Sequence, residues 1–335
     1  MHTGKSYKFS EFLVWTKRNI YVLVTWSSIA VVLYKVGGFS WLAVPWPVVA
    51  LLGTATAFIV GFKNTQSYNR TMDAQQVWIS IVTSCRVWGT MSRDFLHDPA
   101  ATRELIYRHF AWLNALRYQV RQPRTWETIS KIYNVAYNRF YCVPERDVPL
   151  QEVLAPYLPK NEIELVLASS NPASYILSLQ SASIKSLYEK KEILINFYIE
   201  FGKMISGMYD QQGRSERIKN FPYPRQYSII NRFFIRLFCF LLPFGMLTEF
   251  DGLNLLVHGF MKGNMVWLVI PFSVIISWMY TSLEQVGESS ENPFEGSAND
   301  VPISHLSRNI EIELREMLGE TDLPPVLEVK NNIML

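Results

Sequence analysis

The segment that most constrains the fold of this chain is residues 48–70, which read VVALLGTATAFIVGFKNTQSYNR. An apolar run of helix length passes directly into a polar, Asn-rich segment. Because a bilayer core needs roughly 20 apolar residues per helix, we expect a membrane helix that ends near the water boundary. Thr54, Phe58 and Phe62 recur every four residues and share one face of that helix. Such a stripe either packs against a neighbouring helix or lines a narrow pore among several copies.

Four stretches are apolar enough for membrane spans, namely residues 20–34 with their flanks, 41–62, 233–248 and 265–283. The third contains Arg236, which we expect to reach the interface or to face protein. No small-residue cleavage site follows the first, so the first two are expected to form an uncleaved helical hairpin. Basic residues lie before the first and third stretches and after the second, which places both termini in the cytoplasm.

The composition excludes several classes of protein. Hydrophobic residues make up 49% of the 335 residues, too many for an ordinary soluble enzyme. The net charge is only +3, which argues against a nucleic-acid partner. Cys85, Cys142 and Cys239 lie far apart and indicate neither a disulfide framework nor a zinc site.

The central block has the periodicity of helices and almost no strand-like alternation. The expected fold is therefore an all-α membrane protein with four membrane helices and a helical cytosolic domain. We divide it into an N-terminal segment with the first two membrane helices (1–70), a cytosolic helical domain (71–230), the last two membrane helices (231–285) and a cytosolic C-terminal segment (286–335).

No catalytic arrangement can be found in the sequence. The five histidines have no metal-ligand spacing, and phosphate-binding loops and nucleophile motifs are absent. We therefore expect neither enzyme activity nor a cofactor.

Three short blocks resemble one family, the bestrophins, and especially their bacterial members. The blocks are GFKNTQSYNR at 61–70, RIKNFPYP at 217–224 and ENPFEGSANDVP at 291–302. Each block is a weak motif alone, but their order and spacing cover most of the chain. The resemblance implies a homopentameric ion channel in the cell (inner or plasma) membrane, with the second membrane helix lining the pore.

The resemblance also assigns residues. The family's hydrophobic neck maps onto Thr54, Phe58 and Phe62, with Thr54 where a bulky aliphatic residue is usual. A second, cytosolic constriction is expected near Ile195, Asn196 and Phe197.

A calcium site is not expected. Eukaryotic members carry an acidic calcium clasp after the third block, but here only a degenerate version remains around Asn292, Glu295 and Asp300. Calcium takes six to eight oxygen ligands, and these side chains supply too few carboxylates.

The sign of the permeant ion depends on competing charges. Phenylalanine ring edges and a ring of Lys63 favour anions, whereas possible rings of Glu284, Glu288 and Glu291 favour monovalent cations such as sodium. We expect chloride-type anions. Two alternatives from other classes are a membrane-anchored scaffold or signalling module that conducts nothing, and a membrane enzyme with a buried cofactor. The enzyme is the poorest of the three, because the sequence offers no ligand set. The oligomeric state distinguishes the channel from the scaffold, because only a ring with the second membrane helix at its axis can conduct ions.

Overall fold

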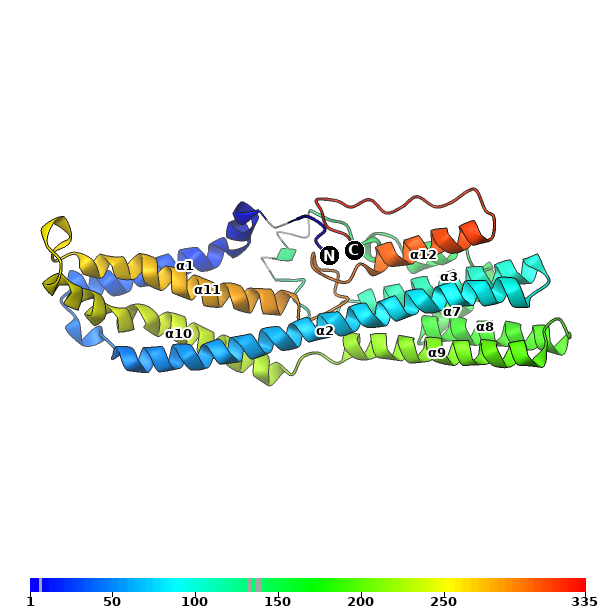
Figure 1. Ribbon diagram of the computed structural model, residues 1–335, viewed down its shortest axis with the longest axis horizontal. Coiled ribbons are helices and arrows are strands. Elements are labelled where there is room, and N and C mark those ends of the chain that lie inside the picture. The colour runs from blue at the N-terminus through cyan, green and yellow to red at the C-terminus, as the bar shows by residue number, and fades with distance from the viewer. Residues whose placement is uncertain (6–7, 132–133, 136–139) are drawn as a thin grey trace. The chain divides into compact units, whose positions relative to one another are not determined.

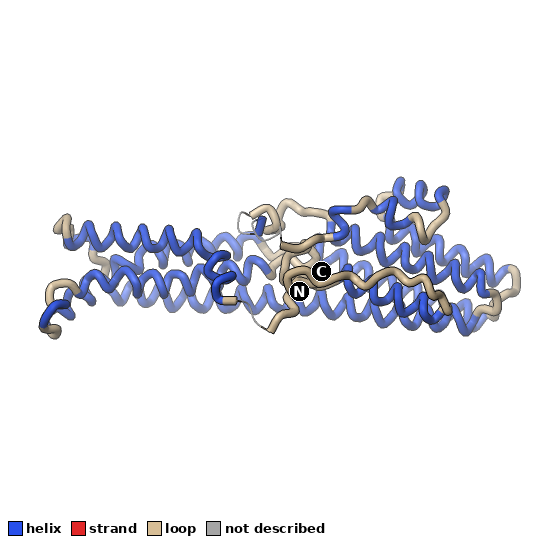
Figure 2. Tube along the Cα trace, turned by 90° about the horizontal axis from the view of Figure 1, so that it is seen from above, coloured by secondary structure: helices blue, strands red, loops and turns tan. Residues whose placement is uncertain are grey.

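The computed structural model describes residues 1–5, 8–131, 134–135 and 140–335. Within these residues the chain forms helices and loops without a β-strand, which confirms the expected all-α fold (Figure 2). It divides into two compact units. The apolar unit consists of Lys5–Asn69 and Tyr223–Glu291, and the polar unit consists of Met1–Gly4, Arg70–Pro222 and Asn292–Leu335.

Four long helices supply the apolar unit (Figure 1). They are α1 (Phe9–Lys35), the first half of α2 (Trp46–Phe95), α10 (Arg225–Gly252) and α11 (Val269–Ser289). Short 3-10 turns follow α1 and α10, namely η1 (Ser40–Leu42), η2 (Leu253–Leu255), η3 (Gly259–Met261) and η4 (Met265–Leu268). Three segments are long and apolar enough to cross a membrane, namely Ser40–Phe95, Ile195–Leu255 and Met265–Ser289. Helix α1 is not among them, so the fourth span stays a prediction.

Glycine allows close helix packing in the apolar unit. A Cβ at Gly53 of α2 would lie 2.7 Å from the Phe238 ring of α10, and one at Gly245 would lie 2.7 Å from Val49. Small residues at such contacts let two membrane helices approach closely. The result is a tight α2–α10 pair that fixes which face of α2 is buried.

The polar unit contains the second half of α2 and seven further helices of the described chain (Figure 1). These are α3 (Pro99–Arg121), α5 (Pro144–Asp147), α6 (Leu150–Leu154), α7 (Lys160–Ala168), α8 (Pro172–Glu189), α9 (Ile195–Asn220) and α12 (Ile303–Met317). Asp98 caps α3 by accepting hydrogen bonds from Ala100 N and Ala101 N, and Pro99 occupies the first turn. These are the residue types that begin a helix.

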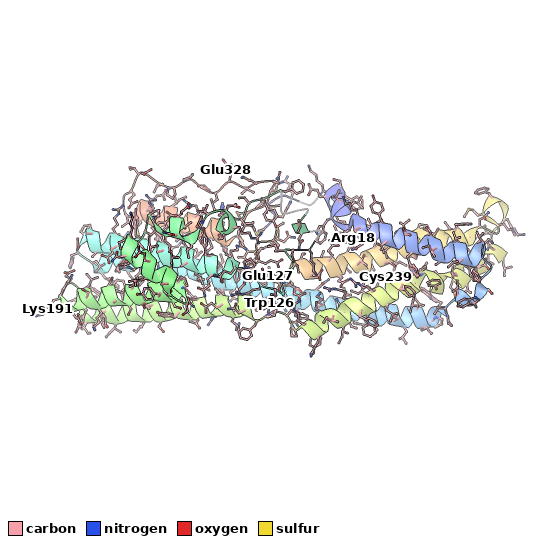
Figure 3. The ribbon with its side chains drawn as sticks, turned by 180° about the vertical axis from the view of Figure 1, so that it is seen from behind. Arg18, Trp126, Glu127, Lys191, Cys239 and Glu328 are labelled. Carbon is pink, nitrogen blue, oxygen red and sulfur yellow. The ribbon has the colours of Figure 1, made fainter. Side chains whose placement is uncertain are left out.

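The core of the polar unit is aromatic. Trp88, Trp112, Phe110 and Phe201 are fully buried, and Trp88 packs edge-on against Phe201. The unit also buries charges in pairs. Glu127, labelled in Figure 3, follows α3 and pairs with Lys219 of α9.

Candidate functional site

Helix α2 has two distinct faces in the apolar unit. The residues turned into the unit are spaced three and four apart and are Gly53, Thr56, Val60, Lys63 and Ser67. The expected neck residues Thr54, Phe58 and Phe62 lie on the opposite face and are exposed. Phe58 is 77% exposed and Phe62 59%. Most of the surface of these two large rings is therefore left uncovered by the rest of the chain.

Two hydrogen bonds involve the buried face of α2. Thr56 donates its hydroxyl hydrogen to Leu52 O at 2.7 Å, and the Tyr280 hydroxyl of α11 donates to Gly53 O at 3.0 Å. The buried face is thus fixed by both packing and hydrogen bonds. This arrangement holds the exposed stripe in one orientation.

Lys63, which directly follows the expected neck residues, does not stand free. Its side chain is 2% exposed, and its Nζ lies 3.3 Å from a carboxylate oxygen of Glu291, which is 6% exposed. Nζ also lies 3.4 Å from Ser228 Oγ at the start of α10. The sequence expectation treats Lys63 and Glu291 as separate charge rings, whereas the structure pairs them. The two charges therefore offset one another within the chain.

Glu284 and Glu288 of α11 face a cation from α10. Arg232 Nε lies 3.5 Å from Glu284, and the Arg232 guanidinium donates to Glu288. The acidic series that favours cations in the sequence is therefore partly neutralised. Sequence reasoning missed this role of Arg232. If the last two spans form an antiparallel hairpin, the start of α10 lies beside the end of α11. That arrangement predicts the contact of Arg232 with Glu284 and Glu288.

The residues expected at the cytosolic constriction lie in the first turn of α9. Ile195 is 49% exposed and Asn196 is also exposed. The Phe197 ring instead stacks on Phe95 at the end of α2, with centroids 4.1 Å apart and planes 8° from parallel. Packing thus occupies Phe197, and the side chains open to a partner are those of Ile195 and Asn196.

Asp300 organises the loop between α11 and α12. Its carboxylate accepts hydrogen bonds from the backbone nitrogens of Phe294, Gly296 and Val301 at 2.6–2.8 Å. The same group accepts from the Arg121 guanidinium at 2.5 Å. Phe294 and Gly296 adopt positive φ angles of 69° and 81°, which the carboxylate contacts hold in place. Asp300 therefore closes a rigid loop.

The degenerate clasp offers no calcium ligand set among the described residues. No group of three or more His, Cys, Asp and Glu side chains is placed to hold a metal ion there. Asp300 has its donors within the protein, Asn292 is buried, and Glu295 accepts from Thr128 N and the Thr128 hydroxyl. Protein hydrogen bonds thus occupy the carboxylates of Asp300 and Glu295.

Burial raises the pKa of the Glu295 carboxyl to about 8. In the unfolded chain its value is 4.5, so the folded state binds a proton between these limits that the unfolded state lacks. The free energy of unfolding should therefore fall as pH rises from about 4.5 to 8, on the order of a few kcal/mol. Glu295→Gln should remove this fall, measured by thermal unfolding across pH. A matched change at the exposed Glu316 should leave it intact, and an unaltered slope in Glu295→Gln would contradict the assignment.

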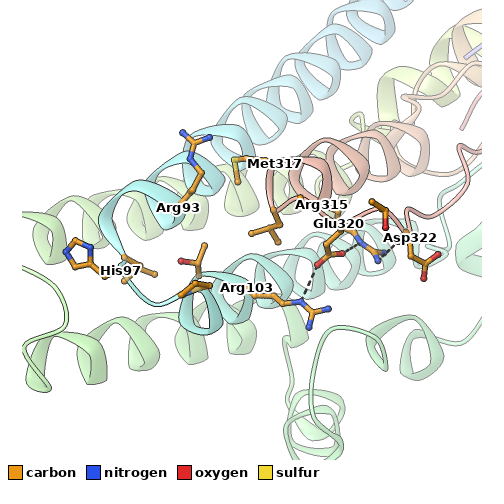
Figure 4. Close-up of a pocket in the computed structure, with 13 residues that line it drawn as sticks. Arg93, His97, Arg103, Arg315, Met317, Glu320 and Asp322 are labelled. Atoms are coloured by element: carbon orange, nitrogen blue, oxygen red, sulfur yellow. Dashed lines mark hydrogen bonds and ion pairs between the residues drawn. The ribbon is translucent and has the colours of Figure 1, made fainter.

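A cavity of about 750 Å³ lies where the end of α2, the start of α3 and the segment after α12 meet (Figure 4). Its cations are already paired. Arg103 and Arg315 both contact Glu320, and Arg93 contacts Asp94. The Tyr107 hydroxyl donates to Glu320 at 2.9 Å. This cluster fastens the segment after α12 to α3.

Comparison with known proteins extends over most of the chain. A family model described as "Bacterial/Fungal Bestrophin protein" matches residues 18–316. Voltage-dependent anion channel-forming protein YneE of Escherichia coli K12 is 26% identical over 276 residues, which are 82% of this chain and 77% of that protein. Voltage-dependent anion channel-forming protein RSc3414 of Ralstonia nicotianae is 26% identical over 281 residues. The match covers 82% of this chain and 78% of that protein.

The fold also matches a solved structure. A bacterial bestrophin homologue from Klebsiella pneumoniae superimposes with a TM-score of 0.75 over 91% of this chain and 98% of that one. The two sequences are 24% identical over the match.

Proposed function

Because the chain belongs to the bacterial and fungal bestrophin family, we propose that it is the subunit of a homopentameric channel that conducts small monovalent anions across the cell membrane. Four membrane helices from each subunit surround the pore, both termini lie in the cytoplasm, and α2 is innermost. Membership in this family and the channel names of its relatives also confirm that the chain is not an enzyme.

The exposed stripe of α2 supports this proposal most directly. Thr54, Phe58 and Phe62 form a stripe that the protomer leaves uncovered, while the opposite face of α2 is packed and hydrogen-bonded. Five copies around an axis would bring the rings together as a hydrophobic neck, which gates by dewetting. Ile195 and Asn196 would form the second constriction in the cytosolic part.

The charge pairs weaken the attraction for cations, although the pairing of Lys63 with Glu291 also removes a positive ring that would favour anions. Lys63 cancels Glu291, and Arg232 offsets Glu284 and Glu288. The acidic attraction for cations is thereby reduced, whereas the positive edges of the Phe58 and Phe62 rings remain. Relatives named as anion channel-forming proteins agree with this sign.

The assembly should be a closed five-fold ring, because only a ring with α2 at its axis can conduct. Native mass measurement in detergent or nanodiscs should give a mass five times that of the 38.9 kDa chain. A monomer or dimer as the dominant species would contradict the channel and favour a membrane scaffold.

The reversal potential in asymmetric sodium chloride should shift toward the chloride equilibrium potential. Planar-bilayer recording of the purified pentamer measures it. A shift toward the sodium equilibrium potential would show that the carboxylates of α11 outweigh the phenylalanine edges, and the anion assignment would then be wrong.

A further inference from the structure

A groove of about 740 Å³ in the apolar unit is lined by residues of α1, α10 and α11. Most of its surface is apolar and includes Tyr21, Val22, Trp26, Ile29 and Phe240. The Trp26 and Phe240 rings stack with centroids 4.6 Å apart and connect the two helices. Arg18 of α1 and Cys239 of α10, both labelled in Figure 3, also line the groove.

Two arginines of this groove have no close counter-charge; Glu284 acts on Arg236 electrostatically, but its carboxylate is engaged by Arg232. Arg18 and Arg236 are exposed, and neither makes an ion pair or hydrogen bond with any residue in the described part of the chain. Glu284 also lines the groove, but it lies 3.5 Å from Arg232. Arg232 and Arg236 are one turn apart on α10, and Arg232 pairs with both carboxylates of α11.

The two guanidinium groups can reach a single ligand. Helices α1 and α10 run in parallel, because Trp26 Nε1 donates to Phe240 O at 3.0 Å and the Tyr34 hydroxyl donates to Asp251 at 3.2 Å further along both helices. Arg18 precedes Trp26 by eight residues and Arg236 precedes Phe240 by four. Their levels along the helices therefore differ by about one turn, roughly 5–6 Å. Arginine side chains span that offset.

An uncompensated arginine beside apolar helix surface is costly in a bilayer. A phosphate diester removes this cost, because guanidinium groups bind its oxygens through paired, charge-assisted hydrogen bonds. We propose that the groove binds one anionic phospholipid of the surrounding bilayer. Its phosphate lies between Arg18 and Arg236, and an acyl chain packs along Trp26 and Phe240.

The charges at the groove favour an anionic over a zwitterionic lipid. Two arginines supply positive charge, and Arg232 already engages Glu284, which would otherwise attract a choline group. The inference requires that α1 and α10 lie in the membrane and does not require conduction.

Native mass spectrometry of the purified assembly tests this site. Released from nanodiscs of mixed phosphatidylcholine and phosphatidylglycerol, the protein should retain phosphatidylglycerol selectively. Arg18→Gln combined with Arg236→Gln should weaken phosphatidylglycerol binding by about tenfold or more, since two charge-assisted contacts are lost. Lys17→Gln is the matched control, because Lys17 is exposed beside Arg18 but does not line the groove.

Equal retention of the two lipids, or equal loss in the control, would overturn the proposal. Unchanged phosphatidylglycerol binding in the double variant would also overturn it. In that case the partner of Arg236 would instead be a carboxylate of a neighbouring subunit. Arg18→Gln alone keeps the test valid if Arg236→Gln does not fold, since Arg18 is an exposed helix residue and its loss should still reduce retention. Ion flux of the same samples is measured separately, so failure of the lipid site and failure of conduction are told apart.

Discussion

Phe58→Ala is expected to raise anion flux by on the order of tenfold, which corresponds to a barrier lower by about 1.4 kcal/mol. The Phe58 side chain is 77% exposed in the protomer, so its removal costs little packing within the subunit. In a five-fold ring, loss of the aromatic side chain widens the neck and makes it easier to wet. Chloride efflux from liposomes that contain the purified assembly measures the effect.

Ile275→Ala on α11 is the matched control, because Ile275 is 59% exposed in the same unit but lies on a helix outside the proposed pore. Its flux should equal that of the unmodified chain. Unchanged flux in well-folded Phe58→Ala assemblies would place the gate elsewhere. Ile195→Ala is then the next variant to measure.

Asp300→Ala is expected to destabilise the polar unit by about 3–5 kcal/mol. The substitution leaves three backbone N–H groups without an acceptor and removes the closest carboxylate from the buried Arg121. Glu145 stays 3.7 Å from Arg121, which keeps part of the compensation. Denaturant unfolding of the purified protein measures the change.

Glu313→Ala provides the contrast to Asp300→Ala. Glu313 pairs with Arg86, and both side chains are largely exposed at 43% and 55%. Surface pairs contribute within about 1 kcal/mol. If Asp300→Ala costs no more than Glu313→Ala, the carboxylate of Asp300 does not hold the loop.

The sequence determined the helical class and the main apolar segments of this protein. Apolar runs of bilayer length and proline breaks are local signals, and a helix satisfies its own backbone within such a run. Helices begin at Pro99, Pro144 and Pro172, since proline suits the first turn of a helix. The three resembling blocks likewise pointed to the bestrophin family, which the family match confirms.

Only the tertiary structure decided which charges are free and which are paired. Lys63 and Glu291 are 228 positions apart, and Arg121 and Asp300 are 179 apart, so no local pattern links them. From the sequence alone, a charged side chain is expected to be solvated, because water is its usual partner. Packing of helices within each unit removes that water and brings opposite charges together, since a buried charge is tolerated only with a partner. The exposure of Thr54, Phe58 and Phe62 was decided in the same way, by Gly53 and Gly245 drawing the other face of α2 against α10.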